Sequence, residues 1–349
     1  MSMLCGIDLH RDQITFDALD ASTGEVWRGR LFQPHRLRLR RWLAEELGPR
    51  AHGQPVAVAV EGCTGWRYVV EEVVAAGFEA HVAEPAETQD KRGPKHRAKT
   101  DRSDARLLRE LLANGQLPES WVPPQPVLEW RERVRLYKSL VDQRTQWAQR
   151  VHAELFQHGL PVSENAVRSA KTRAALTSPA LPVSPAAGQR IAAAYQMMAA
   201  TDALLVPLHH DIVAFARRQP ACRALMRAHF GIGELTAVAV WCELGDCRRF
   251  RRSEQAVRHA GLDIKVDRSD RHHGKGYLTH QGPPVLRWAL YEAAKCSYRR
   301  TSPDHAYYTA TKERLHDGKL ATLSVARKLA LRCYHTLRAL DPIEVYAIP

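Results

Sequence analysis

Short apolar runs and helical patterns alternate over the first third of the chain. Three apolar segments separated by turn signals predict consecutive antiparallel strands at 4–9, 13–20 and 25–32. The run Val56–Val60 is continuously apolar, as expected for a strand that is buried on both faces. Further patterns predict helices at 34–47, 68–76 and 104–113 and a short strand at 79–82. Three strands followed by alternating helices and strands predict an α/β sheet of the ribonuclease H type.

The rest of the chain is predominantly helical. A long polar helix is predicted at 126–157, where Val127, Val134 and Val141 recur at the heptad spacing of a coiled coil. A stretch rich in Ser, Pro and Ala at 161–188 reads as a linker before a second long helix at 189–218. Beyond Pro220 the pattern is helical, apart from one loop at 262–282. These changes in sequence pattern along the chain predict three regions, 1–122, 123–220 and 221–349.

Composition excludes disordered and membrane-spanning proteins and favours a polyanionic binding partner. With 45% hydrophobic residues the 349-residue chain is not disordered, and it contains no apolar run of about 18 residues that would span a membrane. Met1–His10 lacks the pattern of a secretory signal, and seven scattered cysteines indicate reduced thiols, so we expect a cytoplasmic protein. A net charge of +13 favours a polyanionic partner, nucleic acid before membrane.

Four acidic residues stand at the ends of predicted elements. Asp8 ends the first strand, Glu61 ends the buried strand, and Asp101 and Asp104 lie three residues apart at a helix start. Acids so placed can converge in one cleft and hold Mg²⁺ or Mn²⁺, which activates a nucleophile and stabilises the leaving oxygen of a phosphodiester. Each acid also has an ordinary interpretation, since Asp101 fits an N-cap, Asp104 a first-turn acid and Glu61 a partner of an arginine.

Basic residues surround the second pair of acids. Positive charge beside a metal site suits a phosphate backbone that passes through the cleft, although a solvated basic loop has the same composition. The run comprises Lys91, Arg92, Lys95, Arg97, Lys99, Arg102, Arg106 and Arg109.

Two features of the C-terminal region carry candidate chemistry. The turn Gly231-Ile232-Gly233 between helical stretches is typical of a helix-hairpin-helix element, whose N–H groups can bind phosphate. The loop at 262–282 places Ser269 among cations such as Arg268 and Lys275, where a serine can be an activated nucleophile or an ordinary turn residue. The loop also contains His272, His273 and His280, but it lacks the cysteine partners of a typical zinc site.

Several of these segments match one family in order along the chain. The sequence resembles the insertion sequence 110 transposases, the DEDD transposases with a RuvC-like domain. Gly6-Ile7-Asp8-Leu9-His10-Arg11 and Glu61-Gly62-Cys63-Thr64-Gly65-Trp66 match the first two acidic motifs, and 99–108 matches the third. In the C-terminal region the matches are 230–237, 244–246, 249–250 and 260–262.

The resemblance implies a RuvC-like domain, a coiled-coil dimerisation arm and an all-helical transposase domain. It implies recombination of double-stranded DNA by a homodimer or homotetramer, guided by a structured non-coding bridge RNA. In that family the acids, here Asp8, Glu61, Asp101 and Asp104, bind Mg²⁺, and a serine forms a covalent intermediate with DNA. The serine is carried over to Ser269, although Asp270 follows it here where relatives have glycine.

Other functions remain open on the residues alone. A RuvC-like junction resolvase would use the same acids with metal-activated water. An actin-like sugar kinase also opens with three antiparallel strands, but it needs a second glycine-rich phosphate loop, which this sequence lacks. A third alternative is a nucleic-acid-binding protein without catalysis. The remaining serines of the C-terminal region that we considered, Ser253, Ser297 and Ser324, lie in helical patterns.

Overall fold

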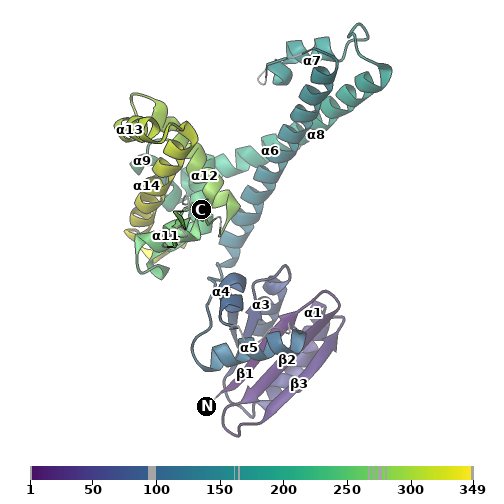
Figure 1. The fold of residues 1–349 in the computed structure, drawn as a ribbon. Helices are drawn as coiled ribbons and strands as arrows, with labels where there is room; N and C mark the ends of the chain where they lie inside the picture. The colour runs from purple at the N-terminus through teal and green to yellow at the C-terminus, as the bar shows by residue number, and fades with distance from the viewer. Residues whose placement is uncertain are drawn as a thin grey trace. The chain divides into compact units, whose positions relative to one another are not determined.

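The chain divides into two compact units, Met1–Val122 and Pro123–Pro349 (Figure 1). The computed structural model describes residues 2–92, 100–160, 162–163, 166–265, 268–269, 272–273, 277–279 and 281–346, without the side chains of 265, 268, 269, 272, 273 and 277.

The first unit is built on a mixed five-stranded sheet of order β3-β2-β1-β4-β5. The strands are β1 (Met3–Leu9), β2 (Gln13–Asp20), β3 (Val26–Phe32), β4 (Val56–Glu61) and β5 (Glu79–Ala83). The first three are antiparallel neighbours, while β4 is parallel to both β1 and β5. The three consecutive antiparallel strands expected from the sequence are therefore confirmed, and the mixed sheet is compatible with a ribonuclease H-like fold.

Side-chain alternation divides the sheet into two different faces. Cys5 and Ile7 on β1 and Val58 and Val60 on β4 pack into one core cluster with Trp42. Because successive side chains point to opposite faces, Asp8 and Glu61 belong to the other face, which α5 (Asp101–Ala113) covers. The valines of Val-Ala-Val-Ala-Val thus fill one core, and the small alanines leave room for the helix on the other side.

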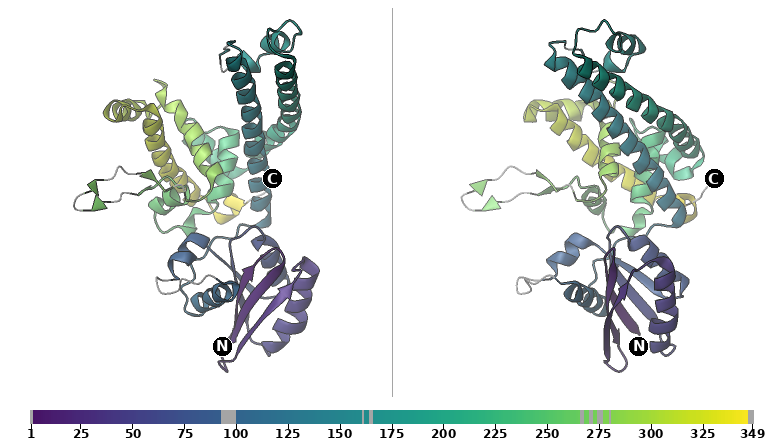
Figure 2. Two further views of the ribbon diagram at one scale, coloured as in Figure 1. Left: turned by 45° about the vertical axis from the view of Figure 1, so that its right-hand side comes forward. Right: turned by 90° about the vertical axis from the view of Figure 1, so that its right-hand side faces the viewer.

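The helices of the first unit lie on both faces of the sheet. The face opposite α5 carries α1 (Arg36–Trp42) and α3 (Trp66–Ala75), as Figure 2 shows. The helix expected at 34–47 is in fact α1, a π-helical turn η1 (Leu43–Leu47) and the single turn α2 (Gly48–Arg50). A further short helix, α4 (Pro85–Asp90), has no counterpart among the predicted elements.

A pair of long helices extends through the second unit. α6 (Gln125–Gln157) and α8 (Pro185–Arg218) lie side by side over much of their length (Figures 1 and 2). The interpretation of 161–188 as a plain linker is wrong, because it contains the turn η2 (Ala166–Arg168), the helix α7 (Ala170–Leu176) and the start of α8. Tertiary contacts stabilise these short elements, since Val167 and Leu176 are buried against the helix pair.

By length and composition, α8 could cross a membrane, since an 18-residue window has a mean hydropathy of 1.3. Some of its apolar side chains pack against other parts of the same unit. Ile191 and Tyr195 pack against Val151 of α6, and the ring of Phe215 stacks on Trp130 with centroids 3.9 Å apart. Packing against neighbouring helices thus buries 33% of that window, while Met197, Leu204 and Val206 of α8 are exposed.

The remaining helices of the second unit form a bundle around α10. The fully buried Trp241 of α10 donates a hydrogen bond to the carbonyl of Val345 at 2.6 Å and packs against Phe215. The helical elements of this bundle are α9 (Pro220–Ala228), α10 (Glu234–Leu244), η3 (Cys247–Arg249), α11 (Ser253–His259), α12 (Pro284–Lys295), η4 (Cys296–Tyr298), α13 (His305–Leu315), α14 (Gly318–Arg338) and α15 (Pro342–Tyr346).

The segment expected to be a loop at 262–282 contains four two-residue strands. β6 (Ile264–Lys265) pairs with β9 (Tyr277–Leu278), and β7 (Arg268–Ser269) pairs with β8 (His272–His273), all antiparallel. The chain therefore folds back on itself here, which the mixture of charged and histidine residues did not indicate.

Candidate active site

Two of the four predicted acids are neighbours because their strands are neighbours. β1 and β4 are parallel, and Ile7 pairs with Val60, so that Asp8 and Glu61 follow at adjacent positions. Both belong to the sheet face that α5 covers, and both line a single pocket. The sheet register thus brings together two acids that lie 53 positions apart in the sequence.

The other two acids reach this point because α5 packs unusually close to β1. An added Cβ at Gly6 would lie 2.0 Å from the carbonyl oxygen of Ala105, so only glycine permits this approach. The helix is also fixed by Arg109, whose Nε donates to Asp17 of β2 at 2.6 Å in a buried ion pair. The first turn of α5, with Asp101 and Asp104, is thereby held over the end of β1.

Thr100, and not Asp101, is the N-cap of this helix. The Thr100 hydroxyl accepts from the N–H of Ser103 at 3.2 Å, and the Ser103 hydroxyl accepts from the N–H of Thr100 at 3.1 Å. This reciprocal cap leaves the carboxylate of Asp101 free of the capping role that the sequence suggested for it. Asp101 Oδ2 instead accepts a hydrogen bond from the side chain of Gln13 at 2.7 Å.

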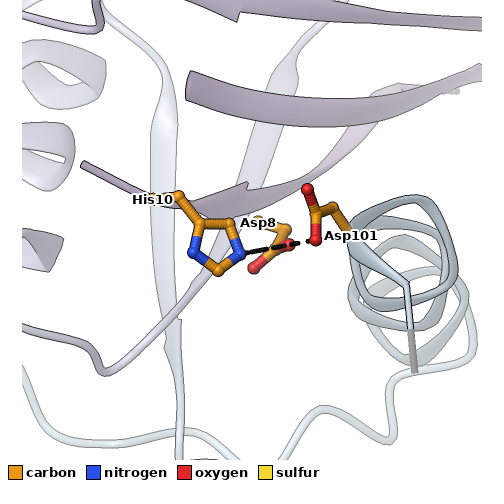
Figure 3. Close-up of side chains that lie close together, drawn as sticks. All are labelled: Asp8, His10 and Asp101. Carbon is orange, nitrogen blue, oxygen red and sulfur yellow. Dashed lines mark ion pairs between the residues drawn. The ribbon is translucent and has the colours of Figure 1, made fainter. Parts of the chain in front are cut away.

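Asp8, His10 and Asp101 form a compact group (Figure 3). Nε2 of His10 lies 3.2 Å from Asp8 Oδ2 and 3.6 Å from Asp101 Oδ1, and one ligand atom from each residue lies within 4.8 Å of the others. His10 was not among the candidate residues inferred from the sequence. The sequence signal that could have identified His10 is its position two residues after Asp8, at the end of the same strand.

Asp104, the fourth acid, is paired with a cation. It lines the pocket together with Asp8 and Glu61, and its carboxylate is ion-paired with Arg92. Arg92 follows α4, the helix that sequence patterns missed. The pocket is lined by Asp8, Glu61, Thr88, Gln89, Arg92, Asp104, Leu107 and Leu108.

Asp8 is the electrostatic centre of the group. Burial raises the pKa of its carboxyl group to about 6, with Asp104 and Asp101 adding to the rise and the imidazole of His10 opposing it. Its Oδ2 atom is buried and accepts no hydrogen bond. A buried, unsatisfied carboxylate oxygen among further carboxylates is suited to a divalent cation. The cation would coordinate the oxygen and would neutralise the excess negative charge of the group.

The predicted basic run has several different roles in the structure. Arg102 is exposed on the first turn of α5, whereas Arg92, Arg106 and Arg109 form ion pairs with acids of the same unit. The buried Arg109 is therefore a packing residue rather than an exposed basic one. Three of the predicted contact residues, Lys95, Arg97 and Lys99, lie outside the described residues.

The glycine turn before α10 is closely packed. Gly231 has a φ of +87°, and a Cβ there would lie 2.3 Å from the carbonyl oxygen of Ala293, so glycine is required. The N–H of Gly233 donates to the Thr236 hydroxyl at 2.9 Å, and Glu234 begins the helix. A donor satisfied internally and an acid at the first position do not favour phosphate, and the phosphate contact stays a prediction.

Ser269 lies in β7, where it pairs with His272 of β8, and Arg268 precedes it on the same strand. Their side chains, and all of Lys275, Asp270 and His280, lie outside the described part of the chain. The alternative serines are in helical elements, as expected: Ser253 begins α11, Ser297 is buried in η4, and Ser324 lies within α14.

Comparison with known proteins agrees with this arrangement. Residues 5–159 match a family model of DEDD transposases of the IS110 group, and residues 223–309 match the model "Transposase IS116/IS110/IS902 family". The chain is also 21% identical over 244 residues to the transposase for insertion sequence element IS1111A of Coxiella burnetii (strain RSA 493 / Nine Mile phase I). That similarity covers 69% of this chain and 66% of the relative, so the chain spans just under two thirds of the relative's length.

The acidic pocket on a mixed sheet and the helical unit that follows it are compatible with both family models. The two family models follow each other along the chain and together cover more than half of it. The chain belongs to the IS110 family of transposases.

Proposed function

We propose that this protein is the transposase of an insertion sequence, a site-specific recombinase that cuts and rejoins double-stranded DNA. The observation that supports this best is the convergence of Asp8, Glu61 and Asp104 in one pocket, with Asp101 beside it on α5. Acids from two strands and one helix meet although their sequence positions span nearly a hundred residues. No packing requirement calls for four acids at this place, whereas phosphodiester chemistry does.

These four acids would hold Mg²⁺, or Mn²⁺ in its place. The buried, unpaired oxygen of Asp8 supports this assignment, since a cation would satisfy it. When bound, such an ion would stabilise negative charge on the phosphate oxygens. All four acids are carried by β1, β4 and α5, whose packing against one another fixes where the side chains would hold the ion.

Strand transfer would proceed through a serine-linked intermediate, with Ser269 as the nucleophile. Its hydroxyl loses a proton as the oxygen bonds to phosphorus, the bond from phosphorus to the leaving sugar oxygen breaks, and that oxygen takes up a proton to become a free hydroxyl. Attack by the sugar hydroxyl of a new DNA end reverses the step and releases the serine. Because one phosphoester bond replaces another, the reaction needs no external energy source.

The partners follow from family membership and charge. DNA at the element ends and at the target would contact the positive residues of both units, including Arg102 and Arg268. A structured non-coding RNA would supply the target specificity, and the chains would assemble as a dimer or tetramer. The region 123–220, with the long helices α6 and α8, is the proposed dimerisation arm, and 221–349 is the proposed transposase domain with its hairpin element and Ser269.

A covalent-adduct assay tests the proposed chemistry. The full chain is incubated with Mg²⁺, RNA transcribed from the element's flank, and DNA that spans the element junction and a target, and the products are separated under denaturing conditions. We expect a protein–DNA adduct that is absent in Ser269→Ala and present in Ser253→Ala, which removes a serine from a helix start.

The outcomes separate the alternative reactions. An adduct that survives in Ser269→Ala moves the nucleophile to another residue. Cleavage without any adduct favours a junction resolvase that uses metal-activated water. Nucleic-acid binding without Mg²⁺-dependent cleavage would indicate a binding protein and contradict the proposal. We further expect Asp8→Ala to lose cleavage while it retains RNA binding, and normal cleavage in that variant would refute the role of the acids.

A further inference from the structure

His10 stands where a ligand of the proposed metal would stand. Its Nε2 atom is 3.2 Å from Asp8 Oδ2 and 3.6 Å from Asp101 Oδ1 (Figure 3). Ligands in neighbouring positions of an octahedron, with bonds of about 2.1 Å, are about 3.0 Å apart. Both distances from the nitrogen are therefore close to the spacing of neighbouring ligands on a single ion, and the three ligand atoms all lie within 4.8 Å of one another.

The burial of Asp8 adds an independent observation. Asp8 is only 7% exposed, and its Oδ2 atom accepts no hydrogen bond although the His10 nitrogen lies close to it. An unsatisfied buried carboxylate oxygen is costly, and the His10 imidazole, an ion-pair partner 3.2 Å away, makes no hydrogen bond to this one. A cation between Oδ2 and Nε2 would satisfy the oxygen and accept the lone pair of a neutral imidazole at the same time.

The surroundings favour an ion that keeps some of its water. The side chain of His10 is 56% exposed and that of Asp101 is 35% exposed, whereas the side chain of Asp8 is 10% exposed. One side of the group is thus closed by protein and the other is open to solvent. Water and phosphate oxygens can complete the coordination from the open side.

We propose that His10 is a nitrogen ligand of the catalytic cation, which makes this a mixed nitrogen–oxygen site that binds Mn²⁺ more tightly than Mg²⁺. The inference rests on the proposed function and extends it to the identity of the ion. Mg²⁺ is bound by oxygen ligands and keeps its water, whereas imidazole is a common ligand of first-row transition ions and accompanies carboxylates in di-manganese sites. An imidazole ligand would enlarge the preference for Mn²⁺ beyond that of a cleft with carboxylates alone.

Pulsed electron paramagnetic resonance of Mn²⁺ tests the ligand directly. With Mn²⁺ added below one equivalent to the full wild-type chain, we expect the nitrogen modulation of a coordinated imidazole. The modulation should disappear in His10→Ala and persist in His81→Ala. His81 lies on β5, its imidazole contacts Glu119 at 2.8 Å, and it does not line the pocket. Mn²⁺ bound without nitrogen modulation, or modulation that survives in His10→Ala, would overturn the inference.

Calorimetric titration distinguishes two roles for His10: a ligand of the metal ion, or a positively charged neighbour of the two carboxylates. If His10 is a ligand, His10→Ala weakens Mn²⁺ binding by about tenfold or more and changes Mg²⁺ binding by less than about twofold. If His10 is only a protonated partner of the two carboxylates, its removal strengthens the binding of both ions alike, which would contradict the proposal. Circular dichroism and the melting temperature establish that each variant is folded.

The same experiments keep this inference distinct from the proposed function. Wild-type protein that binds Mn²⁺ and Mg²⁺ with equal affinity and without nitrogen coupling refutes the role of His10, while the acidic site stands. Wild-type protein that binds neither ion, and whose Asp8→Asn variant behaves identically, refutes the metal site and the proposed chemistry together.

Discussion

Asp104 is ion-paired with Arg92 inside the acidic pocket. The side chain of Arg92 is 21% exposed, and its Nε atom is buried without a hydrogen-bond partner. A guanidinium therefore lines the same pocket as the carboxylates of Asp8, Glu61 and Asp104. A divalent ion that binds Asp104 has to compete with this internal cation.

The first prediction concerns that competition. Arg92→Gln removes the internal cation and should strengthen the binding of Mn²⁺ or Mg²⁺ by about fivefold, since a charge pair near the surface contributes on the order of 1 kcal/mol. Calorimetric titration without nucleic acid measures the effect. Arg102→Gln, an equal charge change at an exposed position of α5, should alter the affinity much less. Equal effects of the two substitutions would show that only net charge matters.

The second prediction concerns the closeness of α5 to β1. In Gly6→Ala the new methyl group would meet the backbone of Ala105 and Arg109 at 2.0 and 2.6 Å, so the helix has to move. Overpacking of this kind costs about 1–3 kcal/mol of stability, and here it also shifts Asp101 and Asp104 away from Asp8. We expect a lower melting temperature together with weaker metal binding.

Gly188→Ala is the matched control for that substitution. Gly188 lies within α8, where an added Cβ would meet only Val183 at 4.0 Å among non-neighbouring atoms. Alanine is the better helix former, so the melting temperature should be unchanged or slightly higher and metal binding unaffected. If Gly6→Ala were equally mild, the close approach would not be what positions the acids.

The acids that the sequence singled out are the ones whose positions follow from regular structure. Asp8 and Glu61 directly follow apolar residues of two strands, and adjacent parallel strands end at the same edge of a sheet. Asp101 and Asp104 share a helix start, so that one close helix–sheet contact brings both into place. Such inferences require only the strand order and the period of each element.

The pairing of Arg92 with Asp104 and the contacts of His10 with Asp8 and Asp101 could not be derived in this way, because they depend on side-chain positions at the ends of elements. Arg92 follows α4, whose pattern Pro-Ala-Glu-Thr-Gln-Asp carries no apolar periodicity. α7 was likewise not predicted, because its surroundings are rich in Ser, Pro and Ala. The helix is stabilised by the burial of Leu176 against the long helices. Tertiary contacts, rather than local propensity, determine these elements.

The third prediction concerns a buried acid that joins α6 to α10. Glu243 is fully buried, and its carboxylate lies 3.2 Å from Arg131 and 2.9 Å from Arg135. Glu243→Gln removes the charge that compensates the largely buried Arg131. Breaking such a pair costs about 3 kcal/mol or more, so we expect a marked loss of stability in thermal and denaturant unfolding.

An exposed pair on the same helix provides the comparison. Asp142 is ion-paired with Lys138 one turn away on α6, and its side chain is 52% exposed. Asp142→Asn should change the free energy of unfolding by less than about 1 kcal/mol, because solvent screens such pairs. A similar loss in both variants would mean that burial does not distinguish the two carboxylates.

The fourth prediction concerns acid stability of the second unit. Burial, reinforced by Arg249 and Arg131, lowers the pKa of His259 to about 3 in the folded protein. In the unfolded chain the pKa is about 6.5, so below that value the unfolded state binds the extra proton and stability falls as the pH decreases. Between about pH 7 and about pH 5.5 this amounts to roughly 1 kcal/mol.

His259→Gln isolates this contribution, because it removes the titrating group and keeps a polar side chain near the carbonyl of Glu243, which lies 3.3 Å from Nε2 of His259. Denaturant unfolding followed by tryptophan fluorescence at both pH values gives the two free energies. The wild type should lose roughly 1 kcal/mol more than the variant on acidification. Since protonation of a carboxylate paired in the folded state would affect both proteins equally, parallel losses would exclude His259 as the acid-sensitive group.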